Sequence, residues 1–355
     1  MATQFEIEYA LMAGRAYQST RDTINWFPVP DGWKEFFHVP NNPDYPIFTG
    51  LSGFEAVSFQ KISNPKEIVI SFAGTNGPTD IADNRTNLSL GLLGRSCSQL
   101  QEAALYYCQV KVANPDATIT LTGHSLGGGL AAAIAVFFDI KAVTFDQAPF
   151  NRAVSLGANG AAVRDNLVAY LVDHGVSEQT LLPLRSYGSG DTQRAAENVT
   201  YQCVDGEFLS LPPFTVVDRI GIAKEPLTHG APDTGPGNLH SITLLAAFLE
   251  NKNFQEVTTE LPDMLRMVFD STLYYNDPNN KVNPKENFLE RLVRHQEGLD
   301  PTVPNDGDDM LTRFTSDMQK IAQTSGLADV NNDLIKAYIA FGMQAYYGNR
   351  LASNK

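Results

Sequence analysis

Five consecutive residues combine a reactive side chain with the small neighbours that it would need. Residues 123–127 read Gly-His-Ser-Leu-Gly, which fits the pattern G-x-S-x-G with Ser125 at its centre. A β-branched stretch at 117–122 precedes them, and helix-forming residues at 130–138 follow. This context predicts a nucleophile elbow, a strained strand-to-helix turn that projects the hydroxyl from the sheet. We expect Leu126 to offer its backbone N–H to an oxyanion; the alternative is a glycine-rich turn that only packs a helix on a sheet.

A serine hydroxyl needs a base to remove its proton, and the sequence offers six histidines for that role. His240 is preferred because it follows the glycine-rich segment 235–237, opens a helical pattern and comes late in the chain, as the order Ser, acid, His requires. His229 is the alternative. The other four lie beside the serine on its strained turn, near the ends of predicted helices, or in a loop before the elbow: His124, His174, His295 and His38.

The acid that orients the imidazole should follow a strand between the serine and the histidine. Asp205 and Glu207 come directly after a strand pattern at 199–204. They are favoured over Asp191, which lies in a loop, and Asp146, which ends another strand pattern. Because side chains alternate along an extended segment, Asp205 and Glu207 would point to one face, and their spacing alone does not choose between them.

A second oxyanion donor is expected from the turn that follows an earlier strand. Residues 67–72 read as a buried strand that runs into Ala73-Gly74-Thr75, so we expect Thr75 to offer its N–H and its hydroxyl. The alternative is an ordinary strand-end turn. Two segments with apolar side chains, 76–93 and 211–236, are predicted as lids over such a site.

These residues belong to a region in which strand-like and helix-like segments alternate. Strand patterns lie at 67–72, 117–122, 141–145 and 199–204, and helical patterns at 96–113, 130–138 and 161–173. Such alternation implies right-handed crossovers, and hence an α/β fold with a mostly parallel sheet covered on both faces. Residues 251–355 show only helical spacing punctuated by prolines. We therefore predict a catalytic domain at 1–250 and a helical C-terminal extension at 251–355.

Composition narrows the range of partners. Among 355 residues, 40 acidic side chains outnumber 26 basic ones, and the net charge of −14 argues against nucleic acid as a partner. No apolar run is long enough to cross a membrane, and Glu6 and Glu8 stand where a Sec-type leader would be basic and apolar. We therefore expect a cytoplasmic location or export by a leaderless route.

Neither a metal nor another cofactor is expected. The acidic loops at 277–281 and 305–309 do not complete the twelve-residue pattern of a calcium-binding loop. The three cysteines are widely spaced and form no CxxC pair, so they are expected to be reduced packing residues: Cys97, Cys108 and Cys203.

Four motifs in combination resemble the class 3 lipase family and its bacterial phospholipase A1 relatives. They are I-V-I-S-F-A-G-T at 68–75, G-H-S-L-G-G at 123–128, V-T-F at 143–145 and L-H-S at 239–241. The resemblance implies an α/β-hydrolase core that cleaves carboxylic esters of lipids through a Ser–acid–His triad. Carried over motif by motif, it implies Ser125 as nucleophile, His240 as base, and Thr75 and Leu126 as oxyanion residues.

This sequence departs from the family pattern at two places. Ala73 stands where the family often has arginine. The family's acid, usually aspartate before two apolar residues, appears here as Glu207-Phe208-Leu209, a pattern that favours Glu207 over Asp205. The helical residues after about 250 lie outside the resemblance.

The sequence therefore predicts a serine ester hydrolase that acts on lipids, of the triacylglycerol lipase or phospholipase A1 type, in transient contact with a lipid interface. One alternative is a short-chain carboxylesterase or thioesterase with the same triad. The other is a non-catalytic interaction protein built on the hydrolase fold.

Overall fold

A mixed β-sheet organises the part of the chain that the structure describes. The computed structural model describes residues 2–18, 27, 29–39, 52–74, 98–188, 194–230, 236–250, 255 and 259. Its strands are β1 (Trp33–Val39), β2 (Ala56–Lys61), β3 (Glu67–Phe72), β4 (Thr118–His124), β5 (Lys141–Phe145), β6 (Val199–Gln202) and β7 (Ile222–Ala223). The strands lie in sequence order, antiparallel from β1 to β3 and parallel from β3 to β7, so the predicted mostly parallel sheet is confirmed.

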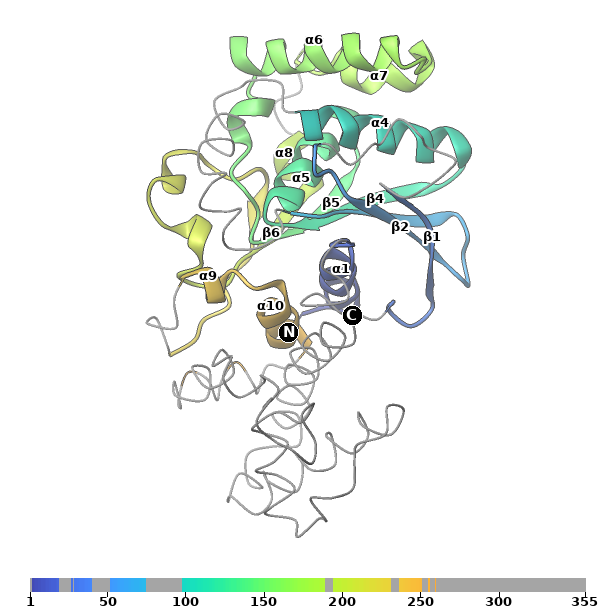
Figure 1. Cartoon of the computed structure of the whole chain (residues 1–355). Helices are drawn as coiled ribbons and strands as arrows, with labels where there is room; N and C mark the ends of the chain where they lie inside the picture. Colours follow the sequence, from blue (N-terminus) through green and yellow to red (C-terminus); the bar gives the residue numbers. More distant parts are fainter. Residues whose placement is uncertain are drawn as a thin grey trace, which may run out of the picture.

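Helices cover both faces of this sheet (Figure 1). They are α1 (Gln4–Arg15), α4 (Ser98–Ala113), α5 (Leu126–Phe138), α6 (Ala158–Asp173), α7 (Glu178–Ser186), α8 (Arg194–Asn198), α9 (Pro236–Leu239) and α10 (Ile242–Glu250), with 3-10 turns η1 (Asn151–Val154), η2 (Phe208–Ser210) and η3 (Phe214–Val216). Right-handed crossovers between parallel strands that advance in one direction place every connecting helix on the same face. Helices α4 to α8 lie on that face, and α1 and α10 cover the other.

Strand β3 contributes side chains to the hydrophobic clusters on both faces of the sheet. Its side chains alternate in direction, so Ile68, Ile70 and Phe72 enter the cluster beneath α4 and α5, while Val69 enters the cluster beneath α1 and α10. All four are fully buried, and each contributes about 1.5–3 kcal/mol of hydrophobic stabilisation. The end of β3 is thereby held rigidly beside the start of α5.

Helix α5 is apolar on all sides because it lies between the sheet and other helices. Every residue from Gly127 to Phe138 is buried. The helix predicted at 130–138 begins four residues earlier, at Leu126, because the glycines that read as a turn form its first turn. This early start brings the helix N-terminus directly to Ser125.

The structure adds elements that periodicity did not reveal. Helix α1 and the antiparallel strands β1 and β2 were not among the predicted elements, although α1 carries a capping box: Thr3 N–H donates to Glu6 Oε2 at 2.7 Å, and Glu6 N–H donates to Thr3 Oγ1 at 3.4 Å. The predicted helical extension lies outside the described residues, apart from 255 and 259. Among the described helices, none has the length and apolar character needed to cross a membrane.

Candidate active site

Ser125 occupies the turn between β4 and α5 with φ of 57° and ψ of −125°. A positive φ is uncommon for a residue with a side chain, so the backbone is strained here. Both glycines of the motif are required by close backbone contacts. A Cβ on Gly127 would lie 2.1 Å from the carbonyl oxygen of Phe72, and a Cβ on Gly123 would lie 2.5 Å from that of Gly127.

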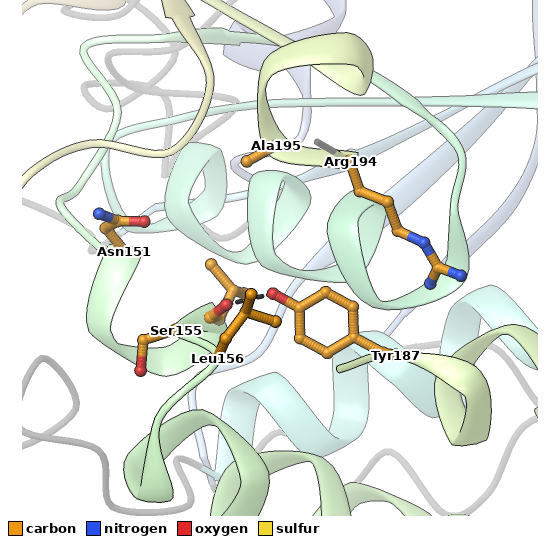
Figure 2. Close-up of a pocket in the computed structure, with 7 residues that line it drawn as sticks. Asn151, Ser155, Leu156, Tyr187, Arg194 and Ala195 are labelled. Atoms are coloured by element: carbon orange, nitrogen blue, oxygen red, sulfur yellow. Dashed lines mark hydrogen bonds between the residues drawn. The ribbon is translucent and has the colours of Figure 1, made fainter. Parts of the chain in front are cut away.

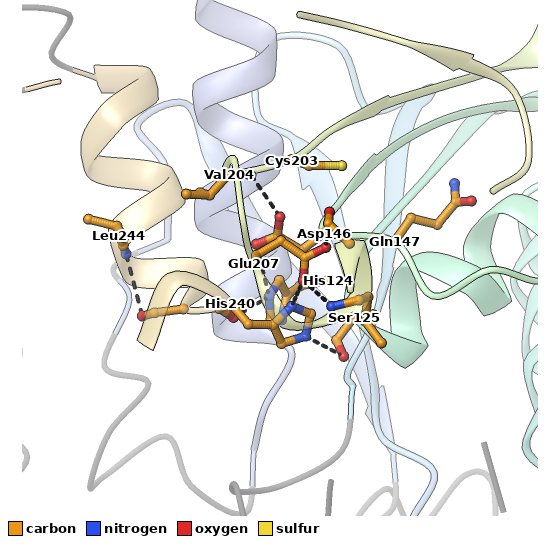
Figure 3. Close-up of polar contacts among 12 residues, drawn as sticks. His124, Ser125, Asp146, Gln147, Cys203, Val204, Glu207, His240 and Leu244 are labelled. Atoms are coloured by element: carbon orange, nitrogen blue, oxygen red, sulfur yellow. Dashed lines mark hydrogen bonds and ion pairs between the residues drawn. The ribbon is translucent and has the colours of Figure 1, made fainter. Parts of the chain in front are cut away.

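The predicted base, His240, lies between α9 and α10 and reaches back to the elbow. Its Nε2 is 2.8 Å from Ser125 Oγ (Figure 3). The backbone N–H of His240 donates to the carbonyl oxygen of Pro236 at 3.1 Å, which anchors the residue to the end of α9. The alternative histidine, His229, is half-buried, and its Nε2 contacts the backbone oxygen of Asp205 at 2.8 Å.

Glu207 completes this row of polar groups from the opposite side of the imidazole. Its Oε2 is 2.6 Å from His240 Nδ1 and also accepts the Leu209 N–H at 2.7 Å. Its Oε1 accepts the Ser210 hydroxyl at 2.8 Å and a hydrogen bond from the Arg219 guanidinium. Burial alone raises the pKa of Glu207, but His240, Arg219 and the Leu209 N–H outweigh it and lower the pKa below its usual value.

The other acid favoured from the sequence, Asp205, does not join this row. It is exposed on the turn that Gly206 completes with φ of 72°, and its backbone N–H donates to the carbonyl oxygen of Leu227 at 3.0 Å. The alternation that would place Asp205 and Glu207 on one face does not apply, because the chain turns between them. The structure thus brings Glu207, and not Asp205, to His240.

One of the two expected oxyanion donors lies among the residues that the structure describes. Leu126 is the first residue of α5, where a backbone N–H has no acceptor inside its own helix. Thr75 lies outside the described residues, as does the segment 76–93 that was predicted as a lid. The neighbours of Thr75 are close to the serine: a Cβ on Gly74 would lie 3.0 Å from Ser125 Cβ. Ala73, at the position where the class 3 lipase family often has arginine, is buried against Tyr17.

Arg219 is a functional neighbour that the sequence did not indicate. Besides Glu207, its guanidinium donates to the carbonyl oxygen of Gln147 at 2.7 Å and to Cys203 Sγ at 3.1 Å. A charged hydrogen bond of this kind fixes the carboxylate and balances its buried charge. A single arginine with no recurring spacing leaves no pattern by which it could have been found.

Two further buried groups, His124 and Asp146, lie beside His240. Neither contacts the Ser125 hydroxyl. His124 Nε2 is 2.9 Å from the carbonyl oxygen of His240 and 3.7 Å from Asp146 Oδ2, and its Nδ1 is 2.7 Å from the Tyr17 hydroxyl. Burial, and then the neighbouring His240, lower the pKa of His124 well below its usual range.

Asp146 is held at the end of β5 by its backbone and one carboxyl oxygen. Its Oδ1 accepts the Val204 N–H at 2.9 Å, and its Oδ2 is buried with no hydrogen-bond partner. Burial, and then the charge of Glu207, raise the pKa of Asp146 well above its usual range.

The only grouping of metal-ligand types among the described residues comprises His124, Asp146 and His240, whose ligand atoms lie within 4.8 Å of one another. Both ring nitrogens of each histidine already have hydrogen-bond partners. We therefore assign no metal to these residues.

A separate cavity of about 170 Å³ lies between α8 and the segment around η1 (Figure 2). Tyr187 and Arg194 form part of its wall, and none of the residues around Ser125 lines it. Arg194 donates to the Pro183 carbonyl at 3.0 Å and to Ser186 Oγ at 3.2 Å, which is a structural use of its charge.

The fold and the site together define the class of this protein. A strained serine between a parallel strand and a helix, hydrogen bonded to a histidine that follows a later strand, is the arrangement of an α/β-hydrolase. The family model described as Tle-like phospholipase domain matches residues 8–219, which is more than half of the chain. The chain belongs to this family of phospholipase-like, ester-hydrolysing domains.

Individual relatives share smaller or more distant similarity. An extracellular phospholipase A1 of Serratia liquefaciens is 39% identical over 97 residues, and this match spans 27% of the present chain and 28% of the relative. The Rhizomucor miehei lipase in complex with its propeptide is 16% identical over 65% of this chain and 71% of that chain, with a TM-score of 0.35. Lip2 lipase of Yarrowia lipolytica is 18% identical over 64% and 78%, with a TM-score of 0.34.

Proposed function

We propose that this protein hydrolyses carboxylic esters of phospholipids with Ser125 as nucleophile, His240 as base and Glu207 as the orienting acid. One observation carries the proposal. The Ser125 hydroxyl, the His240 imidazole and the Glu207 carboxylate form a continuous row with separations of 2.8 Å and 2.6 Å. Each contact has the length of a hydrogen bond, and all three groups are at least nine-tenths buried.

Acylation follows from this geometry. His240 Nε2 takes the proton from Ser125 Oγ as that oxygen attacks the ester carbonyl carbon. Glu207 accepts the Nδ1–H, which leaves Nε2 free to act as the base and stabilises the imidazolium that forms. The backbone N–H of Leu126 and the turn at Thr75 stabilise the oxyanion, and one such donor contributes on the order of 2.7–4 kcal/mol to the lowering of the barrier.

The second half of the reaction returns the enzyme to its resting state. The tetrahedral intermediate collapses as His240 gives its proton to the departing alcohol, which for a phospholipid is the lysophospholipid. Water then attacks the acyl group on Ser125 with His240 again as the base, and the fatty acid leaves. Neither half requires an oxidant, a reductant or a second substrate besides water.

Phospholipid is the favoured substrate class for two reasons. The family is one of phospholipase domains, and the Serratia relative bears the name phospholipase A1, which supports cleavage at the sn-1 ester. The segment that follows Glu207 exposes apolar side chains: Leu211 is 40% exposed and Val216 is 70% exposed. With a net charge of −14, the protein would contact lipid through such residues and not through basic ones. The prediction that 211–236 acts as a lid remains a prediction.

Product analysis tests the proposal. Vesicles of phosphatidylcholine with different acyl chains at its two positions are incubated with the protein, and the released fatty acid is identified by mass spectrometry. We expect the sn-1 chain to be released by the wild type and by Ser155→Ala, which removes a half-buried hydroxyl that donates to the Arg152 carbonyl, away from Ser125. We expect no release by Ser125→Ala.

The same assay separates the rival functions. Release of the sn-2 chain alone would contradict the A1 position. Turnover of short p-nitrophenyl esters or thioesters, with vesicles left intact, would indicate an esterase or thioesterase. Absence of turnover on every ester and thioester would indicate a non-catalytic protein on a hydrolase fold.

A further inference from the structure

A hydrogen-bond chain runs beneath the elbow, from Tyr17, which follows α1, to the backbone of His240. The Tyr17 hydroxyl lies beside Gly74, just beyond the end of β3, where an added Cβ would be 2.4 Å from its oxygen. That hydroxyl lies 2.7 Å from His124 Nδ1, and His124 Nε2 lies 2.9 Å from the carbonyl oxygen of His240. Tyr17, His124 and His240 are each no more than 5% exposed, so water does not compete for these contacts.

The carbonyl end of the chain determines the direction of both bonds in it. A carbonyl oxygen can only accept, so the proton of His124 must be on Nε2, from which it is donated to His240. Nδ1 is then an acceptor, and the Tyr17 hydroxyl must donate to it. The opposite tautomer of His124 would place a bare nitrogen against the His240 carbonyl.

The surroundings keep His124 and Tyr17 uncharged. The groups that face His124 are the Tyr17 hydroxyl, the His240 ring at a centroid distance of 4.7 Å and the Asp146 carboxyl at 3.7 Å. Burial lowers the pKa of His124 well below its usual range and raises the pKa of Tyr17, so both groups are neutral, and burial with the charge of Glu207 raises the pKa of Asp146 well above its usual range. A charge on His124 would repel the imidazolium that His240 becomes during catalysis.

We propose that Tyr17 and His124 are positioning residues that hold His240 in place through its own backbone carbonyl. The inference rests on the proposed function, since it concerns the base of the proposed triad. The fixed tautomer of His124 sets the position of the His240 backbone, and hence of the ring that must meet Ser125 Oγ. Tyr17 also lies beside Gly74, which precedes Thr75 in the segment expected to hold the oxyanion. A small displacement of a catalytic group carries a large cost in rate.

A pair of matched tyrosine variants tests the proposal. Tyr17→Phe removes the donor that fixes the tautomer, while Tyr106→Phe removes a hydroxyl that is 2.8 Å from Ser58 Oγ in the core beneath α4. Active sites are counted by titration with a fluorophosphonate ester, so that kcat refers only to competent molecules. We expect Tyr17→Phe to lower kcat about threefold to tenfold with KM unchanged, and Tyr106→Phe to stay within about twofold of wild type. Equal kcat values in the two variants would overturn the proposal.

Two substitutions of His124 provide an independent test. His124→Gln keeps an N–H that can reach the His240 carbonyl, and His124→Leu does not. We expect glutamine to restore most of the kcat that leucine loses, per titrated site. If the two variants have the same kcat, His124 acts only through packing and the proposal is wrong. Failure of the underlying function would look different: wild-type protein would then neither react with the fluorophosphonate nor turn over ester.

Discussion

Replacing Glu207 with glutamine tests the assignment of the acid, because the change keeps the shape of the side chain and removes its charge. The carboxylate accepts hydrogen bonds from His240, Leu209, Ser210 and Arg219. Glutamine has one oxygen and one NH2 group in place of two carboxylate oxygens. It therefore loses acceptance on one side, either toward His240 and Leu209 or toward Ser210 and Arg219. If the oxygen faces His240, the NH2 group faces the Arg219 guanidinium, donor against donor. If the NH2 group faces His240, the imidazole takes the tautomer whose Nε2 carries a proton and cannot accept one from Ser125.

The first arrangement lowers the stability of the fold and the second lowers kcat, and both effects are large. The wrong tautomer of a triad histidine lowers kcat by on the order of 10³–10⁴, which corresponds to about 4–5.5 kcal/mol of transition-state stabilisation. Loss of the charge partner of Arg219, whose side chain is 13% exposed, lowers the free energy of unfolding by up to about 3–5 kcal/mol. The second effect is a large fraction of the stability of an ordinary domain, so the amount of folded protein must be measured in the same sample.

The assay is hydrolysis of a p-nitrophenyl ester, with folded protein quantified by circular dichroism. Asp205→Asn is the matched control, since it makes the same chemical change at an exposed carboxylate two residues away. We expect its kcat to stay within about twofold of wild type. A loss in Asp205→Asn as large as that in Glu207→Gln, or a Glu207→Gln variant that keeps both its stability and at least a tenth of the wild-type kcat, would refute the assignment of the acid.

Two further predictions concern the elbow and the buried Asp146. Gly127→Ala should be less stable than Gly128→Ala by about 1–3 kcal/mol and should lose activity. A Cβ at position 127 would lie 2.1 Å from the Phe72 carbonyl oxygen, whereas the nearest atom to a Cβ at position 128 would be 3.0 Å away. Equal denaturant midpoints for the two variants would contradict the steric account. Because the pKa of Asp146 is raised on folding, the stability linked to its protonation is present below the unfolded value of 3.8 and is lost as the pH rises toward the folded value. The free energy of unfolding of Asp146→Asn, relative to wild type, should therefore increase from pH 4.5 to pH 7.5, and a constant difference would show that Asp146 has the same pKa in both states.

The elements that could be predicted from the sequence are those whose signal is local. Strand β3 reads as a run of β-branched residues because it is buried on both faces, and its predicted bounds, 67–72, are those of the structure. The elbow motif was recognisable because close backbone contacts demand glycine at fixed positions around Ser125. His240 was favoured from the glycine-rich turn before it and its place in the chain order, and the structure brings it to the serine.

Other features depend on contacts between distant segments and leave little trace in one sequence. Nothing in the spacing of Asp205 and Glu207 reveals that the chain turns between them, and family resemblance supplied the preference for Glu207. Arg219 contacts Glu207, which is 12 residues away in the sequence, and Tyr17 contacts His124, which is 107 residues away. His124 was set aside as a base because it lies on the strained turn, and the structure agrees that it does not reach the serine hydroxyl. Its contact with the His240 backbone required the fold to be known.

The central claim is that His240 makes the Ser125 hydroxyl nucleophilic. Mapping a fluorophosphonate adduct by tandem mass spectrometry, in wild type and in His240→Ala, measures this directly. We expect one adduct per wild-type chain, on Ser125, and at least a thousandfold slower labelling when the imidazole is absent. An adduct on another residue, or labelling at the same rate in both proteins, would contradict the account.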